Sequence, residues 1–556
     1  MRLSTEILVI GGGATGLGAA WDATLRGFKT VLLEKGDLAH GTSGRYHGLL
    51  HSGGRYVIRD PQSARECATE NALLRKIIPS AIEDTGGYFV TTPADPADYA
   101  DQFFAAAQEC KVPVEEVSPT IAFKREPLLN PKISRAFAVQ DAACDSFDAL
   151  HLLAGAIKSA GGEVLLRHHI TEFIKDKDRV VGVAGENLIT GEHFSIYADL
   201  ILNCTGPWAG KVAALAGCQV KVTPGKGVMI ALNSRLTNTV INRCQPPADG
   251  DILVPVGTVS VIGTTDTAVP DPDQYTIEDW EVELLIAEGE HLIPNFRQFR
   301  ALRAWAGCRP LYEDTQPGEQ KDSRFMSRAH ALLDHETRDG VAGLFSMVGG
   351  KLTTFRHMAQ LLIDAACEKL NVERKCLTAE TRLEPTGTKL HTAPQRLATL
   401  EGVAQPPIHL TTQPSDSVIC ECELVTRSQI ETHLQESRSP ILNDLRRDLR
   451  LGMGPCQAGF CAYRAAGIIH EFFNNHPPTP RQRPVATAER EPPNHLNSNS
   501  QLLQFLQERW KGERPVMWGH SLRSLELNLH IYHNLLGVDT LPTERELEVY
   551  PTEKTS

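Results

Sequence analysis

The sequence predicts a mixed α/β protein of more than one domain, and three observations lead to this prediction. The chain opens with a strand–helix–strand unit whose first turn is rich in glycine. Its middle part alternates apolar and polar residues as strands do, and a compact cysteine region follows. With 556 residues, two or three domains are expected. We therefore expect a large α/β domain followed by a small cysteine domain.

The opening unit consists of a buried strand, "EILVIGGG" from residue 6, then a helix, "ATGLGAAWDATLRG", then a second strand, "KTVLLEK". A unit of this kind implies a parallel sheet with both faces covered. Further along, "ADLILNCTG" reads as another buried strand that ends in a glycine turn at residue 206.

The middle of the chain predicts a second sheet and two helices. Strand patterns run from about residue 220 to 275, and they suit a sheet that covers a substrate. Apolar residues at helical spacing follow in residues 276–293 and again in residues 357–371. Stretches rich in proline then divide the rest of the chain. The expected parts are residues 1–375 as the large first domain, 376–416 as a linker, 417–470 as the cysteine domain, 471–498 as a second linker and 499–556 as a helical tail.

Composition limits the possible functions. Hydrophobic residues make up 41% of the chain and charged residues 22%, which is typical of a folded protein. The formal net charge of −12 argues against a nucleic-acid surface, so an anionic small substrate needs a local cluster of cations. We find no signal peptide and no apolar run of about 18 residues. A cytoplasmic protein, soluble or peripheral at a membrane, is expected.

Three glycines at the first turn predict a dinucleotide site. Gly11, Gly13 and Gly16 have the spacing in which the first glycine allows the tight turn, the second lets a pyrophosphate approach and the third lets helix and strand pack closely. Glu34 ends the second strand, where a carboxylate can accept hydrogen bonds from a ribose. An acid at this position disfavours a 2′-phosphate, so FAD or NAD is expected rather than NADP.

The segment after Glu34 favours FAD. Residues 35–57, "KGDLAHGTSGRYHGLLHSGGRYV", are rich in glycine, hydroxyl side chains, histidine and arginine. A flexible, cationic segment suits the wrapping of a flavin and the binding of an anion beside it. A glycine-rich surface loop is the alternative interpretation.

Four of the thirteen cysteines form a pattern, Cys420, Cys422, Cys456 and Cys461. A disulfide between residues one apart fits the preferred geometry poorly, so we expect metal ligands. Four thiolates bind a [2Fe-2S] cluster, and they also bind Zn²⁺. The remaining cysteines stand singly and read as core residues.

Several motifs together resemble a known family. The chain is similar to FAD-dependent glycerol-3-phosphate dehydrogenases, and over nearly its whole length to the large, catalytic A subunit of the anaerobic, three-subunit form. The motifs occur in the family's order: "VIGGGATGLG", "GTSGRYHGLLHSGGRYV", "NCTGPWAG", "IGTTD", "AGCRPL" and "GGKLTTFR".

This resemblance implies a two-domain FAD oxidoreductase fold related to D-amino-acid oxidase, with a Rossmann-type FAD domain and an antiparallel substrate sheet. It also implies that the turn from Gly349 to Thr354 presents backbone N–H groups to the reduced flavin. The implied FAD-binding residues are Gly11, Gly13, Gly16, Glu34, Lys35, Thr42, Ser43, Thr205, Gly206, Gly350, Leu352 and Thr353.

The resemblance further implies oxidation of sn-glycerol 3-phosphate to dihydroxyacetone phosphate by hydride transfer to FAD. The implied substrate-binding residues are Arg55, Tyr56, Arg309, Arg328 and Lys351. Aerobic members carry a histidine shortly after a Lys-Gly pair, whereas this chain has Val228 after Lys226 and Gly227, so the catalytic base is open. The candidates for the catalytic residues are His51, Lys226 and Arg309.

The cysteine region resembles the [2Fe-2S] domain of bacterioferritin-associated ferredoxin (BFD). The resemblance to the anaerobic glycerol-3-phosphate dehydrogenases implies that electrons leave FAD towards a quinone through partner subunits, which hold the chain at the cytoplasmic face of the inner membrane. The tail after residue 495 is a candidate docking element, or a helix packed on its own domain. Two other functions remain open: an FAD and iron–sulfur dehydrogenase of amino acids or opines, and a redox-sensing or scaffold flavoprotein.

Overall fold

The computed structural model describes residues 1–312, 329–383, 416–436, 441–475 and 498–541. The chain divides into two compact units. The large unit contains Met1–Glu186, His193–Phe299 and Ala304–Pro406, and the small unit contains Asn187–Glu192, Arg300–Arg303 and Pro407–Ser556. The two units are described separately below.

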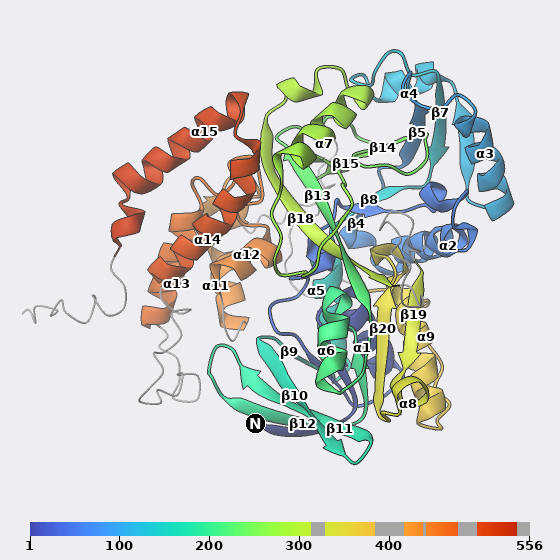
Figure 1. Ribbon diagram of the computed structural model, residues 1–556. Coiled ribbons are helices and arrows are strands. Elements are labelled where there is room, and N and C mark those ends of the chain that lie inside the picture. Colours follow the sequence, from blue (N-terminus) through green and yellow to red (C-terminus); the bar gives the residue numbers. More distant parts are fainter. Residues whose placement is uncertain (313–328, 384–415, 437–440, 476–497, 542–556) are drawn as a thin grey trace, which may run out of the picture. The chain divides into compact units, whose positions relative to one another are not determined.

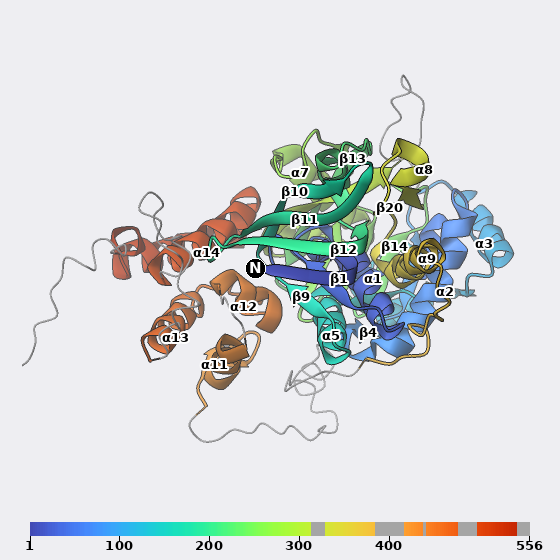
Figure 2. The same ribbon diagram turned by 90° about the horizontal axis from the view of Figure 1, so that it is seen from below.

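The first sheet of the large unit forms around the predicted strand–helix–strand unit. Strand β1 lies between β12 and β2, and both pairings are parallel. Figure 2 shows β10, β11, β12 and β1 side by side. The last four residues of β1, Ile7–Ile10, are all buried, as expected for a covered parallel sheet. The strands are β10 (His168–Asp176), β11 (Arg179–Asn187), β12 (His193–Asn203), β1 (Arg2–Ile10), β2 (Thr30–Leu33) and β9 (Glu163–Leu165), with β20 (Leu344–Gly349) on β12 and β19 (His330–Asp334) on β20.

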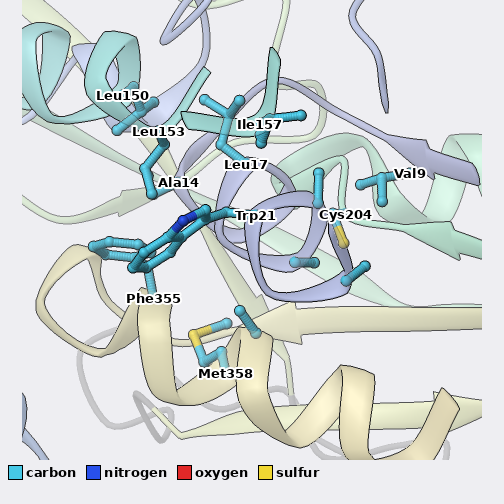
Figure 3. Packing of buried hydrophobic residues seen from close by; sticks show 14 of the residues in the cluster. Val9, Ala14, Leu17, Trp21, Leu150, Leu153, Ile157, Cys204, Phe355 and Met358 are labelled. Carbon is cyan, nitrogen blue, oxygen red and sulfur yellow. The ribbon is translucent and has the colours of Figure 1, made fainter. Parts of the chain in front are cut away.

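Helix α1 (Ala14–Leu25) is central to the packing of this sheet. It packs against α5 (Ser146–Ser159) and α9 (Phe355–Lys369), which is the helix predicted at residues 357–371. In Figure 3, Trp21 of α1 lies beside Phe355 of α9. Both side chains are at most 2% exposed, so α9 packs tightly against α1, the first helix of the large unit. Two short helices, α6 (Ala209–Leu215) and α8 (His335–Asp339), belong to the same part of the fold.

A nine-stranded second sheet confirms the strands predicted between residues 220 and 275. It also contains β5, β6 and β7, which the sequence analysis did not assign. The strands are β17 (Thr267–Ala268), β13 (Val222–Leu232), β16 (Val259–Gly263), β15 (Ile252–Val256), β14 (Val240–Arg243), β5 (Gly87–Thr91), β7 (Arg135–Val139) and β6 (Val114–Val117), with β18 (Ala301–Tyr312) on β13. The helices along this part of the chain are α2 (Pro61–Ile77), α3 (Tyr99–Cys110), α4 (Pro119–Arg125) and α7 (Asp279–Leu292), the last of which was predicted.

A small three-stranded sheet carries the segment that was expected to meet flavin and substrate. It contains β3 (Leu49–Leu50), β8 (Ala142–Cys144) and β4 (Ile82–Glu83). Because β3 is hydrogen-bonded to β8, the residues on either side of β3 have fixed positions.

The small unit is a group of helices around a β-hairpin, and Figure 1 shows these helices as one group. The tail belongs to the same core: Leu502 and Phe505 of α14 pack with Cys420 and Cys461. Of the two interpretations of the tail, the described residues fit a helix packed on its own domain. The expected linkers lie largely outside the described residues, and their boundaries stay a prediction. The elements are β21 (Val418–Cys420), β22 (Val425–Thr426), α11 (Arg427–Glu436), α12 (Leu442–Leu449), α13 (Ala462–Asn475), α14 (Ser498–Glu513) and α15 (Gly519–Leu529).

Among the residues that the structure describes, no helix has the length and apolar character needed to cross a bilayer.

Candidate flavin, substrate and metal sites

The glycine turn between β1 and α1 has the geometry that the motif predicts. Gly11 has a φ of +115°, and a Cβ at this position would lie 2.6 Å from the carbonyl oxygen of Cys204. A Cβ on Gly16 would lie 1.9 Å from the carbonyl oxygen of Gly11, so helix and strand can approach this closely only at a glycine. A Cβ on Gly13 would meet the hydroxyl of Ser43 at 3.3 Å.

Glu34 lies directly after β2 and faces this turn. Its Oε2 accepts a hydrogen bond of 2.6 Å from the N–H of Gly12, and its Oε1 accepts one of 2.6 Å from the N–H of Gly36. Burial raises the pKa of Glu34, and these two N–H groups oppose the rise. The carboxylate is therefore held at the glycine turn, whereas Lys35 beside it is exposed.

The predicted residues Thr42 and Ser43 join the loop after β2 to the rest of the site. The hydroxyl oxygen of Ser43 accepts a hydrogen bond of 3.0 Å from the N–H of Ala14, the first residue of α1. The hydroxyl of Thr42 donates to the carbonyl of Cys308 in β18 at 2.5 Å. Residues far apart in the sequence thus meet at the start of α1.

Thr205 and Gly206 follow β12. They lie next to the glycine turn between β1 and α1, because the preceding residue, Cys204, contacts Gly11. The hydroxyl of Thr205 donates to Oδ1 of Asn203 at 2.7 Å. The amide group of Asn203 donates in turn to the hydroxyl of Ser346 in β20 at 3.1 Å. A chain of buried side chains therefore holds the orientation of Thr205.

The turn between β20 and α9 presents Gly350, Leu352 and Thr353. Gly350 has a φ of +79°, which favours glycine. The hydroxyl oxygen of Thr353 accepts a hydrogen bond of 3.1 Å from the N–H of His51, which follows β3. This bond joins the predicted flavin turn to the segment expected to bind substrate.

The residues around α1 fit FAD. The structure brings together a glycine turn without Cβ atoms, a carboxylate at the end of β2 and the hydroxyl groups of Ser43 and Thr205. These groups would hold the pyrophosphate and the ribose, and the turn at Gly350 would face the isoalloxazine ring. The individual assignments remain predictions.

Three of the expected substrate-site residues lie in one row of contacts. The rings of His51 and Tyr56 are 5.4 Å apart at an interplanar angle of 61°. The ammonium group of Lys351 lies 4.7 Å from the centre of the Tyr56 ring, within the range of a cation–π interaction. The same ammonium donates to the hydroxyl of Ser63 at 2.8 Å. Lys351, within the predicted flavin turn, is therefore positioned by two contacts.

Two arginines of the expected substrate site are each held by an aspartate. Arg55 donates to Oδ2 of the fully buried Asp251 at 2.7 Å. Arg309 donates to Asp266 at 3.2 Å, and a Cβ on Gly227 would lie 2.6 Å from its Nη2. Both guanidinium groups are thus fixed in orientation. Arg328, the further basic residue expected here, lies outside the described residues.

His47 belongs to this group and was missed by the sequence analysis. Its ring lies 6.0 Å from that of His51, and its Nδ1 accepts a hydrogen bond of 3.2 Å from the N–H of Leu49. The neutral ring therefore carries its proton on Nε2. Burial, followed by the charges of Arg55 and Arg309, lowers the pKa of His47 to about 3. Strand alternation gave no signal for His47, because β3 contains only Leu49 and Leu50 and Gly48 has a φ of +89°.

The structure argues against Lys226 as the catalytic base. This residue lies in β13, is 4% exposed and donates to Oε2 of Glu281 at 2.7 Å. It also donates to the carbonyl of Thr276 at 2.9 Å. An ammonium group in such an ion pair has no lone pair with which to accept a proton. The prediction of Lys226 as a catalytic candidate therefore has little support from its surroundings.

The four cysteines of the small unit converge from two segments. Cys420 ends β21 and Cys422 lies in the hairpin turn, while Cys456 and Cys461 lie between α12 and α13. Side-chain contacts join Cys420 to Cys461, and Cys456 to both Cys422 and Cys461. Contact with Cys422 and then with Cys461 lowers the pKa of Cys456 to about 2, which favours the thiolate. The predicted set is thus brought together.

Backbone N–H groups point at these sulfur atoms. Cys420 receives hydrogen bonds from the N–H groups of Gly452 and Glu423, and Cys456 receives them from Ala458 and Phe460. A Cβ on Gly454 would lie 2.3 Å from the Cβ of Cys422, so this loop has room only for glycine. Four thiol groups with several N–H donors fit either a [2Fe-2S] cluster or Zn²⁺.

A second group with metal-ligand chemistry, Cys218, His335 and Asp339, lies in the large unit. Both ring nitrogens of His335 already have partners, Asp339 at 2.5 Å and the hydroxyl of Ser346 at 2.8 Å. Since Ser346 also contacts Asn203, this group is explained as the end of the hydrogen-bonded chain that orients Thr205.

The large unit matches a family model. Residues 6–389 match the model described as FAD dependent oxidoreductase, which covers more than half of the chain. Its fold agrees with two solved structures. The FAD complex of glycerol-3-phosphate dehydrogenase from Bacillus halodurans superposes with a TM-score of 0.62 at 20% identity, over 93% of this chain and 97% of that one. The FAD-bound L-α-glycerophosphate oxidase from Mycoplasma pneumoniae gives 0.54 at 18% identity, over 69% and 100%. The chain is thus an FAD-dependent oxidoreductase.

Relatives with higher identity define the family more narrowly. The A subunit of the anaerobic glycerol-3-phosphate dehydrogenase of Escherichia coli K12 is 38% identical over 96% of this chain and 97% of its own length. The A1 subunit of the corresponding enzyme of Haloferax volcanii is 38% identical over 99% and 93%. The protein belongs to the family of anaerobic glycerol-3-phosphate dehydrogenase A subunits, as the motifs predicted.

Proposed function

We propose that this protein oxidises sn-glycerol 3-phosphate to dihydroxyacetone phosphate and passes the electrons on through partner subunits to a quinone. The observation that carries this proposal is the row His51–Tyr56–Lys351, which adjoins the predicted flavin turn through the bond from His51 to Thr353. FAD, when bound, supplies the acceptor for the hydride at C2. The relatives' names support the substrate.

Arg55, Arg309 and Lys351 would hold the phosphate. The protein has a net charge of −12, so an anion must be held by local cations. Asp251 and Asp266 fix the two guanidinium groups before substrate arrives, which lowers the cost of ordering them on binding. Guanidinium groups also match the geometry of phosphate oxygens.

His51 is the catalytic base in this proposal. Of the three candidates, Lys226 is ion-paired with Glu281, and an arginine such as Arg309 does not give up its proton in proteins. His51 lies between Tyr56 and His47 and next to Thr353, within the group that would surround the reacting carbon. It would accept the proton of the C2 hydroxyl. His47, with its proton on Nε2, would donate a hydrogen bond to a substrate oxygen.

The small unit would carry electrons onward as a BFD-like [2Fe-2S] domain. Cys420, Cys422, Cys456 and Cys461 would be the ligands, and the N–H groups that face Cys420 and Cys456 would tune the potential. Zn²⁺ at the same four sulfurs is the alternative. Attachment to the cytoplasmic face of the inner membrane would come from the partner subunits.

Steady-state kinetics with an artificial electron acceptor test the substrate. The purified chain is given glycerol 3-phosphate, glycerol, amino acids, an opine and other hydroxy acids in turn. We expect glycerol 3-phosphate to have the highest kcat/KM, and Lys351→Met to raise its KM while leaving the FAD content unchanged. A higher kcat/KM for an amino acid or opine would overturn the proposal in favour of the related dehydrogenases, and no turnover of any substrate would favour a scaffold flavoprotein.

A further inference from the structure

A buried arginine from the tail lies against the loop that carries two of the four cysteines. Arg509 belongs to α14, which packs against α12 and α13. It is only 4% exposed. Its Nη2 donates to the carbonyl of Gly452 at 2.8 Å, and the same nitrogen donates to the side chain of Gln457. Arg509 therefore contacts the loop directly beside Cys456.

Among the described residues, the rest of this guanidinium group has no hydrogen-bond partner. Nε and Nη1 of Arg509 are both buried, and within the described part of the chain neither donates to any acceptor. Burying a guanidinium group is strongly unfavourable unless an opposite charge lies close to it. The arginine therefore requires a negative group close by.

Other arginines near the cysteines have carboxylate partners. Arg450 pairs with Glu423 at 3.0 Å, and Arg464 pairs with Glu421 at 2.5 Å. Arg509 forms no ion pair with a carboxylate in the described residues. Glu513, one turn further along α14, acts on it electrostatically, but burial raises the pKa of Glu513 to about 7, so this carboxylate is only partly charged at neutral pH.

Besides Glu513, two of the four cysteines, Cys461 and Cys456, lie within electrostatic range of Arg509. Cys461 and Cys456 both attract its positive charge. Gly452, which accepts a hydrogen bond from Arg509 through its carbonyl, donates through its N–H to Cys420. The guanidinium group is thus linked to the environment of three of the four sulfurs.

We propose that Arg509 is the counter-charge of the four-cysteine site, supplied to it by the tail. This proposal rests on the proposed metal site. A group held by four thiolates is negatively charged, and a [2Fe-2S] cluster gains a further electron on reduction. Because a fixed positive charge stabilises the reduced form more than the oxidised form, Arg509 raises the reduction potential of the cluster. The tail would thereby favour the transfer of electrons from FAD to the small unit.

Three variants of the full chain test this role. Arg509→Met removes the charge and keeps much of the volume, whereas Arg509→Lys keeps the charge. Arg427→Met is the matched control, because it removes a positive charge from the same unit at an exposed pair with Glu431 and Glu471. Iron, sulfide and zinc are measured per chain, and the midpoint potential is measured by anaerobic titration with electron paramagnetic resonance detection.

We expect Arg509→Met to lower the midpoint potential, with Arg509→Lys between it and the wild type and Arg427→Met unchanged. If Arg509→Met loses its iron while Arg509→Lys keeps it, the counter-charge role is supported by metal retention instead. An unchanged potential in Arg509→Met, or equal loss of iron from both Arg509 variants, would overturn it.

The metal analysis separates failure of the cluster from failure of this proposal. If the wild type holds zinc and no iron, the [2Fe-2S] assignment fails, and Arg509 is then tested by the rate at which a chelator removes zinc. Faster removal from Arg509→Met than from Arg427→Met would support the counter-charge role, and equal rates would overturn it. A wild type that holds neither metal would overturn both.

Discussion

Replacing Asp251 by Asn tests whether the arginines are held in position for the phosphate. Asp251 is fully buried, and its Oδ2 accepts hydrogen bonds from Arg55 at 2.7 Å and from the N–H of Ala248 at 2.9 Å. The amide keeps the shape of the side chain and removes the charge. The guanidinium group of Arg55 then loses its ionic partner and its fixed orientation.

The expected magnitudes follow from the burial of this pair. Removing one partner of a buried ion pair costs about 3 to 5 kcal/mol, and the Arg55 side chain is 18% exposed, so we expect about 3 kcal/mol of lost stability. A hydrogen bond to a charged group contributes about 1.5 to 3 kcal/mol. If the phosphate loses its contact with Arg55, the KM for glycerol 3-phosphate should rise about 10- to 150-fold.

Steady-state kinetics and urea unfolding measure the two effects separately. Glu83→Gln is the matched control, because Glu83 forms a comparably buried ion pair with Arg235, with side chains 14% and 11% exposed. This variant should lose stability and keep the wild-type KM. The reasoning is refuted if Asp251→Asn keeps the wild-type KM, or if Glu83→Gln raises the KM by the same factor.

Four further predictions concern single residues. His51→Gln should lower kcat/KM about 10²- to 10⁴-fold with FAD content unchanged, and a kinetic loss below tenfold would exclude His51 as the base. Lys226→Met removes the ionic partner of the buried Glu281, so urea unfolding should show a loss of about 3 to 5 kcal/mol. The pH profile of kcat/KM should keep its wild-type shape, and loss of its acid-side limb would contradict this. Burial, with Arg55 and Arg309, lowers the pKa of His47 to about 3 from an unfolded value of about 6.5, so the unfolded chain binds the extra proton as pH falls between these values and stability is lost. As pH falls from 7 to 5, the free energy of unfolding of His47→Gln should therefore rise relative to that of the wild type in urea unfolding. A constant difference between the two proteins over this pH range would contradict the prediction. Gly454→Ala places a Cβ 2.3 Å from the Cβ of Cys422, so metal analysis should find iron or zinc lost and FAD retained, and full metal content would show that the loop can yield.

Features that depend on short, fixed spacings were predictable from the sequence. The glycines of the first turn, Glu34 at the end of β2 and the pairs of cysteines all follow from offsets that local geometry imposes. Strands β13, β15 and β16 were also predicted, because short runs of apolar residues bounded by turn residues indicate strands. No such local sequence signal exists for contacts between segments that are far apart in the sequence.

The partners of the site residues show this limit. Arg55 meets Asp251 across 196 positions, and Arg509 meets Gly452 across 57 positions. Spacing in the sequence cannot predict such pairs, because they depend on how whole elements pack. For the same reason Lys226 was a reasonable candidate for the base from its motif alone, and only its contact with Glu281 shows that its ammonium group is already ion-paired.

The visible spectrum of the purified, FAD-loaded chain tests the central claim most directly. Glycerol 3-phosphate is added without oxygen and without any artificial acceptor. We predict that the visible absorbance of oxidised flavin is lost and that dihydroxyacetone phosphate forms as the flavin is reduced. The proposed function would be contradicted if glycerol 3-phosphate left the spectrum unchanged. This holds whether an amino acid reduces the flavin instead or no tested compound reduces it.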